Sequence, residues 1–149
     1  MAEGNTNKRP TIPESHLDIM AGFQAVVSTI RHSDGLISTT PISFDWDGEF
    51  VRFSTLKSRV KYKNLLSNPQ ITLCIVSPKD FTRYIEIRGS AEMTDDPGGQ
   101  FNRAIFQRLT GMDEFPYDEP DAERVTVKII PEQISTPLLY GGRLASAAE

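Results

Sequence analysis

The chain has 149 residues, a formal net charge of −4, 38% hydrophobic residues and 24% charged residues. These values are ordinary for one globular domain, and the acidic balance argues against broad nucleic-acid binding. A single cysteine, Cys74, excludes a disulfide framework and a cysteine-based zinc site, and its apolar surroundings in the sequence predict a buried, inert thiol.

Both ends of the chain are small and polar. No apolar run is long enough to span a membrane, and the first residues, MAEGNTNKRPT, lack the apolar core of a secretory signal. We therefore expect a cytoplasmic protein with a disordered head over residues 1–10, one domain over residues 11–136 and a loose tail over residues 137–149.

The pattern of apolar and polar residues predicts three helices and six strands. Thr11 and Glu14 have capping-box spacing, and Asp47-Gly48 between two strand-like runs is typical of a hairpin. Asp96 followed by Pro97 is typical of a helix start. In chain order we expect a helix over 11–22, strands over 23–30, 36–46 and 49–55, a helix over 59–67, strands over 70–77 and 83–93, a helix over 98–111 and a strand over 124–131.

Short strands joined mostly by hairpins predict a mainly β fold with flanking helices, namely a closed or nearly closed antiparallel barrel. Within it, Pro41 cannot donate a ladder hydrogen bond, which indicates an edge, a bulge or a gap that faces a cofactor. The acidic segment MDEFPYDEPDAE, residues 112–123, is either a lid or a solvated connection.

The segment STLKSRVKYKNLLSNP, residues 54–69, carries four cations where a strand runs into a helix. With Ser58 as the predicted N-cap, Arg59, Lys61 and Lys63 lie in the first turns. Each exposed cation at this positive end of a helix costs about 0.3–1 kcal/mol. A bound phosphate or carboxylate reverses that cost, so the pattern predicts an anion site, with a solvated basic face as the alternative.

The sequence offers little support for a metal site, a catalytic side chain or a nucleic-acid ligand. His16 and His32 have no partner at metal-ligand spacing, so we expect no metal site. The chain has no glycine-rich phosphate loop and no nucleophile with an evident base, so no catalytic side chain is predicted. Only Tyr62 is interleaved with the cations, which disfavours single-stranded nucleic acid as a ligand.

The same segment carries a family resemblance. FSTLKSRVKYKNLLSNPQITLCIV, residues 53–76, resembles the split-barrel flavin-binding superfamily that includes pyridoxamine 5′-phosphate oxidases. SRVKYKN, residues 58–64, is similar to the actinobacterial branch of deazaflavin-dependent oxidoreductases, which use coenzyme F-420. EIRGSAEM, residues 86–93, and the hairpin over residues 28–48 resemble further parts of that branch. Leu36-Ile37-Ser38 departs from it, since many members have proline soon after the hairpin glycine.

The resemblance implies an FMN-binding-like split β-barrel that forms a homodimer, with two cofactor sites in the clefts between subunits. It implies an oxidoreductase that uses coenzyme F-420 to transfer a hydride to a conjugated small-molecule substrate. The cofactor carries that chemistry, so no catalytic side chain is named. FMN in place of F-420, as in a pyridoxamine-phosphate-oxidase-like enzyme, and a non-catalytic flavin-binding protein stay open as alternatives.

The resemblance also implies cofactor-binding residues. Arg59 and Lys61 would hold the phosphate, with Lys63 supporting it or holding an acidic tail, and it stays open whether Lys57 and Lys63 reach the ligand. Residues at the ends of strands would contact the ring or the ribityl chain, and Tyr84, or less surely Phe81 and Arg88, would approach from the partner subunit. Asn64 and Tyr84 are each either a contact or a structural residue. The full implied set is Thr39, Thr40, Pro41, Ser54, Thr55, Ser58, Arg59, Lys61, Lys63, Asn64 and Tyr84.

Overall fold

The computed structural model describes residues 8–142. Most of the predicted head, residues 1–7, and part of the predicted tail, residues 143–149, lie outside the described residues. In chain order the elements, with η for a 3-10 helix, are η1 (Glu14–Ala21), β1 (Gln24–Ile30), β2 (Ile37–Ser43), β3 (Asp45–Trp46), β4 (Val51–Leu56), α1 (Val60–Ser67), β5 (Gln70–Val76), β6 (Tyr84–Asp96), η2 (Pro97–Gly99), α2 (Gln100–Thr110), β7 (Arg124–Ser135) and η3 (Leu139–Gly142). Within residues 8–142, no helix is long and apolar enough to cross a membrane.

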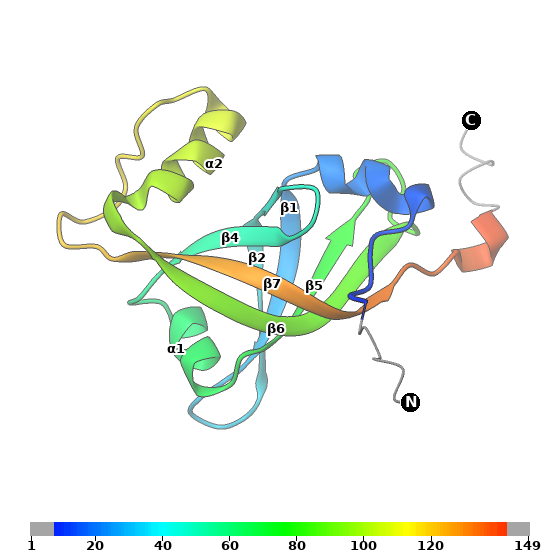
Figure 1. The fold of residues 1–149 in the computed structure, drawn as a ribbon, viewed down its shortest axis with the longest axis horizontal. Helices are drawn as coiled ribbons and strands as arrows, with labels where there is room; N and C mark the ends of the chain where they lie inside the picture. The colour runs from blue at the N-terminus through cyan, green and yellow to red at the C-terminus, as the bar shows by residue number, and fades with distance from the viewer. Residues whose placement is uncertain (1–7, 143–149) are drawn as a thin grey trace, which may run out of the picture.

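The seven strands form one antiparallel sheet in the order β2-β1-β5-β6-β7-β4-β3. The two outermost strands, β2 and β3, are consecutive in the chain and are separated only by Phe44. The sheet therefore curls until its two edges approach each other, which makes the mainly β split barrel that the sequence predicts. In Figure 1 the long strands β6 and β7 run side by side, α1 and α2 lie toward one end of the barrel, and η1 lies toward the other.

One predicted strand is in fact two. The sequence alternates over residues 41–46, but the structure interrupts the predicted strand at Phe44, whose amide donates to the carbonyl of Phe23 at 2.8 Å and whose side chain is fully buried. Before the break β2 pairs with β1, and after it β3 pairs with β4. The prediction of six strands is therefore wrong by one, because the chain changes its pairing partner at this point.

The core lies inside the barrel and follows the predicted alternation. On β7, Val125, Val127 and Ile129 point inward and are almost completely buried, as predicted. On β6, Ile85 and Ile87 do the same. Each such side chain contributes roughly 1.5–3 kcal/mol by leaving water, so the period-two pattern stabilises this register over one shifted by a residue.

The strand β6 bends at Gly89, where its register with β7 shifts between Arg88 and Gly89. A Cβ on Gly89 would lie 2.0 Å from the carbonyl oxygen of Ile130 on β7, far inside van der Waals contact. Only glycine allows the two backbones to approach this closely. This β-bulge lets the two long strands curve with the barrel while they stay paired on both sides of it.

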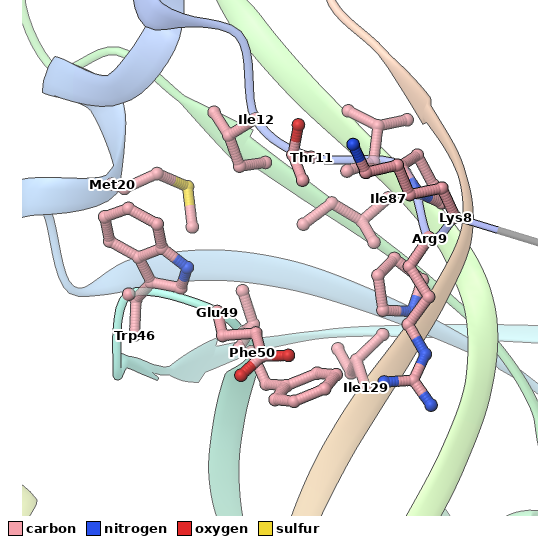
Figure 2. Close-up of a pocket in the computed structure, with 15 residues that line it drawn as sticks. Lys8, Arg9, Thr11, Ile12, Met20, Trp46, Glu49, Phe50, Ile87 and Ile129 are labelled. Carbon is pink, nitrogen blue, oxygen red and sulfur yellow. The ribbon is translucent and has the colours of Figure 1, made fainter. Parts of the chain in front are cut away.

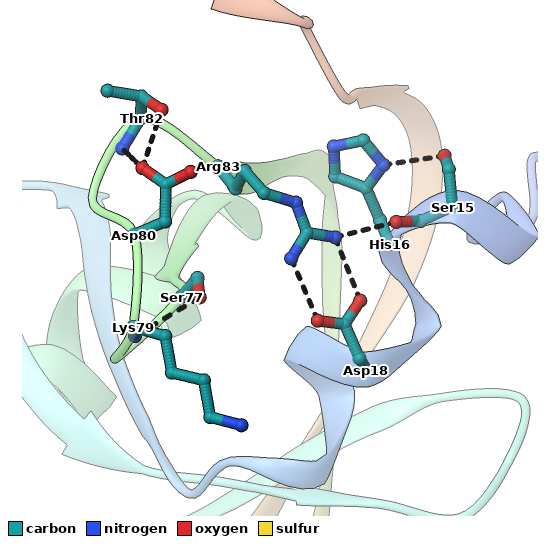
Figure 3. A network of polar contacts seen from close by, with 8 residues as sticks. All are labelled: Ser15, His16, Asp18, Ser77, Lys79, Asp80, Thr82 and Arg83. Atoms are coloured by element: carbon teal, nitrogen blue, oxygen red, sulfur yellow. Dashed lines mark hydrogen bonds and ion pairs between the residues drawn. The ribbon is translucent and has the colours of Figure 1, made fainter. Parts of the chain in front are cut away.

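The predicted first helix is a 3-10 helix that begins later than expected. Its N-cap is Pro13 without a side-chain hydrogen bond, so the predicted capping box is wrong. A polar network fixes η1 instead (Figure 3). Arg83, in the β5–β6 loop, donates to both carboxylate oxygens of Asp18, at 2.8 and 2.9 Å, and to the carbonyl of Ser15 at 2.7 Å. The buried His16 lies beside this ion pair and bonds through Nδ1 to the Ser15 hydroxyl at 2.8 Å.

The helix α2 begins after a short 3-10 turn, η2. Asp96 and Pro97 start that turn as predicted, and the Asp96 carboxylate also accepts hydrogen bonds from the amides of Phe101, at 3.1 Å, and Asn102, at 3.3 Å. This carboxylate therefore satisfies free amides in the first turn of α2 from five residues away. At the other end, Gly111 ends α2 in a left-handed conformation, as predicted.

Candidate functional site

A groove of about 450 Å³ opens between β2 and β4, beside the start of α1. Two other cavities, of about 490 and 660 Å³, are larger, but this groove is where the predicted cofactor residues gather. Two of its cations come from residues 59 and 61, and a third comes from the first residue of β7. Its lining residues are Thr40, Pro41, Ile42, Ser43, Ser54, Thr55, Leu56, Arg59, Lys61, Asn102, Ile105, Phe115 and Arg124.

Six of the eleven predicted cofactor residues line this groove, and they come from two segments of the chain, residues 40–41 and residues 54–61. The six are Thr40, Pro41, Ser54, Thr55, Arg59 and Lys61. The groove does not include the other five, which are Thr39, Ser58, Lys63, Asn64 and Tyr84.

The basic end of the groove lies where β4 passes into α1. The helix begins at Val60 with Arg59 as its N-cap, so the prediction that Ser58 is the N-cap is wrong by one residue. Arg59 has extended backbone and makes no side-chain capping bond, so side-chain capping does not satisfy the first amides of α1. Burial, and then the charge of Arg59, lower the pKa of Lys61. An anion between these two cations would relieve both effects.

The other two cations of the segment lie differently. Lys57 forms ion pairs with Asp95, at 3.0 Å, and with Glu123, at 4.0 Å, and the bond to Asp95 is the main reason that its pKa is raised. Lys63 is exposed and lies outside the groove lining. The structure therefore separates Arg59 and Lys61, which line the groove, from Lys57, whose charge is already compensated.

The third cation of the groove, Arg124, was missed by the sequence reasoning. Its guanidinium donates to both oxygens of Asp118, at 2.8 Å each, and to the hydroxyl of Ser54 at 3.3 Å. It also lies 5.2 Å from the centroid of the Phe115 ring. Arg124 pairs with Leu56 in the β4–β7 ladder, which puts it beside the strand end that leads into the basic segment. Its only signal in the sequence is a cation at the start of a strand.

From residues 112–123, Phe115 lines the groove. Phe115 packs edge-on against Phe106 of α2, with ring centroids 5.0 Å apart, and against Tyr117, at 5.2 Å. The hydrogen bonds to Arg124, followed by the charges of Arg124 and Arg59, lower the pKa of Asp118. The segment is therefore packed and bonded to the barrel, and it is not only a solvated connection.

The lining of the groove includes a hydroxyl that has no hydrogen-bond partner among residues 8–142. Thr40 Oγ1 is buried and has no hydrogen-bond partner among residues 8–142. A buried hydroxyl left unpaired costs roughly 1–3 kcal/mol, which a polar atom of a bound ligand would recover. Pro41 lies next to it and presents no amide proton to the groove. Cations and an unpartnered hydroxyl in the lining of one groove fit a ligand with an acidic group and a polar ring.

Asn64 is fully buried and its side chain is used within the protein. Its Oδ1 accepts hydrogen bonds from the backbone amide of His32, at 3.0 Å, and from His32 Nδ1, at 2.9 Å, while its Nδ2 donates to the hydroxyl of Thr29 at 3.1 Å. These bonds tie α1 to β1 and to the β1–β2 turn. Of the two roles that the sequence left open for Asn64, this geometry favours the structural one.

Two predicted residues lie on the outer face of the sheet. The Thr39 hydroxyl bonds to that of Ser28 at 2.9 Å, and Tyr84 pairs with Val76 at the start of β6. Beside them an apolar groove of about 660 Å³ is lined by residues that include Val26 and Cys74.

Cys74 is half-buried, so the prediction of a buried thiol is wrong in degree, although burial does raise its pKa, with Glu86 adding to the effect.

The comparison with known proteins agrees with this geometry. The family profile described as pyridoxamine 5′-phosphate oxidase matches residues 12–136. The chain belongs to the pyridoxamine 5′-phosphate oxidase family. Among curated proteins, none matches the chain.

Several solved structures resemble the chain over most of its length. An F-420 reductase is 30% identical, with a TM-score of 0.71, and the match covers 83% of this chain and 98% of the reductase. A putative pyridoxamine 5′-phosphate oxidase from Listeria innocua is 23% identical, with a TM-score of 0.61 and coverages of 80% and 93%. A conserved hypothetical protein from Mycobacterium tuberculosis is 19% identical, with a TM-score of 0.65 and coverages of 87% and 88%. The last two likenesses concern the fold alone.

Proposed function

We propose that this pyridoxamine 5′-phosphate oxidase family member is an oxidoreductase that binds coenzyme F-420 in the groove between β2 and β4. The observation that carries the proposal is that Arg59, Lys61 and Thr40, whose hydroxyl has no partner among residues 8–142, line the same groove. The 30% identity to an F-420 reductase supports F-420 over FMN. The substrate would be a conjugated small molecule.

In this proposal each part of the groove has a distinct task. Arg59, Lys61 and the amides at the start of α1 hold the phosphate. Ser54 and Thr55 donate hydrogen bonds to the ribityl chain or the ring, and Thr40 satisfies a polar atom of the ring edge. The bound deazaflavin supplies a hydride to the acceptor. Phe115 and Pro41 keep water away from the ring.

Three of the predicted contacts have a different task in this proposal. Ser58, which is exposed just before the helix, approaches the phosphate only from outside the groove. Lys63 adds to the positive field that an acidic tail meets as it leaves the groove. Asn64 holds α1 in place and makes no contact with the cofactor.

We also propose a homodimer in which the outer face of β1, β2 and β5 meets its copy. Val26 and Val76 are more than 40% exposed there, beside the 660 Å³ apolar groove, and an apolar face of this kind is typical of an interface. Tyr84 would then reach the cofactor bound to the other subunit. Sedimentation equilibrium tests this directly, since a monomer at all accessible concentrations would refute it.

The deciding experiment is a titration of the purified protein with four ligands, oxidised F-420, FMN, riboflavin and a short single-stranded oligonucleotide. We expect saturable quenching of F-420 fluorescence at micromolar or lower concentration, weaker binding of FMN and none of riboflavin, which lacks the phosphate. Tight FMN binding without F-420 binding would establish the FMN alternative. Cofactor binding without reduction of any conjugated acceptor would favour the non-catalytic flavin-binding protein.

A further inference from the structure

A second cavity, of about 490 Å³, lies at the end of the barrel near η1 and shares no lining residue with the cofactor groove. Figure 2 shows it beneath the segment of residues 8–12. Met20 and Trp46 face it from one side, Ile87 and Ile129 from the other, and Phe50 from below. The strap over residues 8–12, η1 and the β3–β4 hairpin thus enclose the inner surface of the sheet without filling the space between them.

The size and composition of this cavity set it apart from a packing defect. Protein interiors are close-packed, and voids larger than a water molecule are few. A volume of about 490 Å³ lies within the range of small-molecule pockets, roughly 300–1,000 Å³. The lining is mixed, with Lys8, Arg9, Thr11 and Glu49 beside apolar side chains. Its apolar part, made by Met20, Trp46, Phe50, Ile87 and Ile129, fits an apolar body such as an alkyl chain or a single ring system.

Positive charge gathers at the rim on one side. Lys8 and Arg9 line the cavity, against one carboxylate, that of Glu49. The Arg9 guanidinium lies 5.3 Å from the centroid of the Phe50 ring, and Lys128 Nζ lies 4.0 Å from the same centroid. Within residues 8–142, no carboxylate forms an ion pair with any of these three cations. Cations drawn to one aromatic ring repel each other, and an anion at the rim would stabilise them.

We propose that this cavity binds a small amphipathic carboxylate, alkyl or aryl, as a second ligand. Its apolar part lies against Trp46, Met20 and Ile129, and its carboxylate lies at the rim between Lys8 and Arg9. The charge of the rim favours an anion over a neutral or cationic amphiphile of the same shape. The proposal does not depend on the identity of the cofactor, because the two sites have no residue in common.

Trp46 lines this cavity and is the single tryptophan of the chain, so tryptophan fluorescence reports binding at this site. Octanoate and octanamide, which differ in charge but hardly in shape, would be titrated into the full-length protein below micelle-forming concentrations while Trp46 fluorescence is followed. We expect a saturable change with octanoate and weaker binding of octanamide. With Lys8→Gln and Arg9→Gln together, octanoate binding should weaken by about two- to fivefold per charge while octanamide binding stays the same.

Two further variants keep the test decisive. Ile12→Phe, in the half-buried part of the strap, should fill the cavity, remove the octanoate response and leave the melting temperature unchanged or raised. Arg59→Ala with Lys61→Ala alters only the cofactor groove and should leave the Trp46 response intact. The proposal is overturned if octanoate gives no saturable change, if octanamide binds equally well, or if the response survives Ile12→Phe.

Discussion

The guanidinium of Arg124 donates two hydrogen bonds of 2.8 Å to the carboxylate of Asp118, and this pair holds residues 112–123 beside the groove between β2 and β4. The side chains of Arg124 and Asp118 are 12% and 22% exposed, so solvent screens the pair only in part. It also fixes Phe115, which packs beneath the guanidinium and lines the groove. The ion pair therefore supports this side of the groove together with the packing of Phe115 against Phe106 and Tyr117.

Asp118→Asn should lower the free energy of unfolding by about 1–2 kcal/mol, because it removes a charge-assisted bidentate pair and leaves Arg124 without its counter-charge. Chemical denaturation measures this value. Asp121→Asn is the matched control, since it makes the same change of charge at an exposed position of the same segment. Equal effects of the two variants would mean that net charge, and not the pair, is responsible.

The same pair predicts a pH dependence. The pKa of Asp118 lies below its ordinary value of 3.8, so its contribution to stability is present above about pH 3.8 and is lost as the pH falls through the folded-state pKa. The difference in unfolding free energy between the native protein and Asp118→Asn should stay constant at neutral and mildly acidic pH and shrink below about pH 4. A difference that already shrinks near neutral pH would contradict this assignment.

His16 predicts a second pH dependence, near neutrality. Burial, and then the charge of Arg83, lower its pKa from 6.5, with Asp18 acting weakly in the opposite direction. The unfolded chain therefore binds the proton more tightly, and stability is lost as the pH falls from about 6.5 through the lower folded-state pKa. Denaturation at about pH 7.5 and about pH 5.5 should show this loss in the native protein and a smaller loss in His16→Gln. An unchanged slope in the variant would exclude His16 as the cause.

Gly89→Ala should lower the free energy of unfolding by at least about 2 kcal/mol, because its Cβ would collide with the backbone carbonyl of Ile130, which cannot rotate away. Gly48→Ala is the control, since Gly48 also has a special backbone conformation, with φ of +96°, but has open space around its Cβ position. That variant should lose only about 1 kcal/mol. Similar losses in the two variants would mean that the close approach of β6 and β7 relaxes without cost.

Arg59→Ala and Lys61→Ala should each weaken cofactor binding by about 10- to 100-fold, the loss expected for a hydrogen bond to a charged group. Lys63→Ala removes an equal charge two residues further along and outside the groove, so its effect should be within about threefold. Calorimetric titration with the cofactor identified above gives all three values. Melting temperatures without cofactor should not fall in the first two variants, because both cations lie at the unfavourable end of α1.

Local patterns in the sequence predict the inward faces of strands and the approximate ends of helices. The inward faces of β6 and β7 follow from period-two alternation, whereas the anion site, inferred from cations at a helix start, stays a prediction. The exact N-cap, Arg59 and not Ser58, does not follow, because the sequence signals at helix ends are precise only to a residue or two.

The features that the sequence did not predict depend on contacts between distant segments. The strand is interrupted at Phe44 because the residues before it pair with β1 and the residues after it pair with β4. The alternation of apolar and polar residues over 41–46 gives no sign of this change. Arg124 joins the groove only because β7 pairs with β4 as well as with β6. No local pattern in the sequence indicates which strands pair. Arg124, Phe115 and Asn102 could therefore not be assigned to the groove from the sequence.

The two ends of the sheet have a consequence for how the protein meets other copies of itself. One end is β3, which has only two residues, and the other is β2, in which Pro41 has no amide proton. A strand from another molecule therefore finds no continuous row of backbone donors and acceptors to extend. The barrel is protected in this way against the edge-to-edge growth that leads to fibrils, and any self-association that it undergoes must use its side-chain faces.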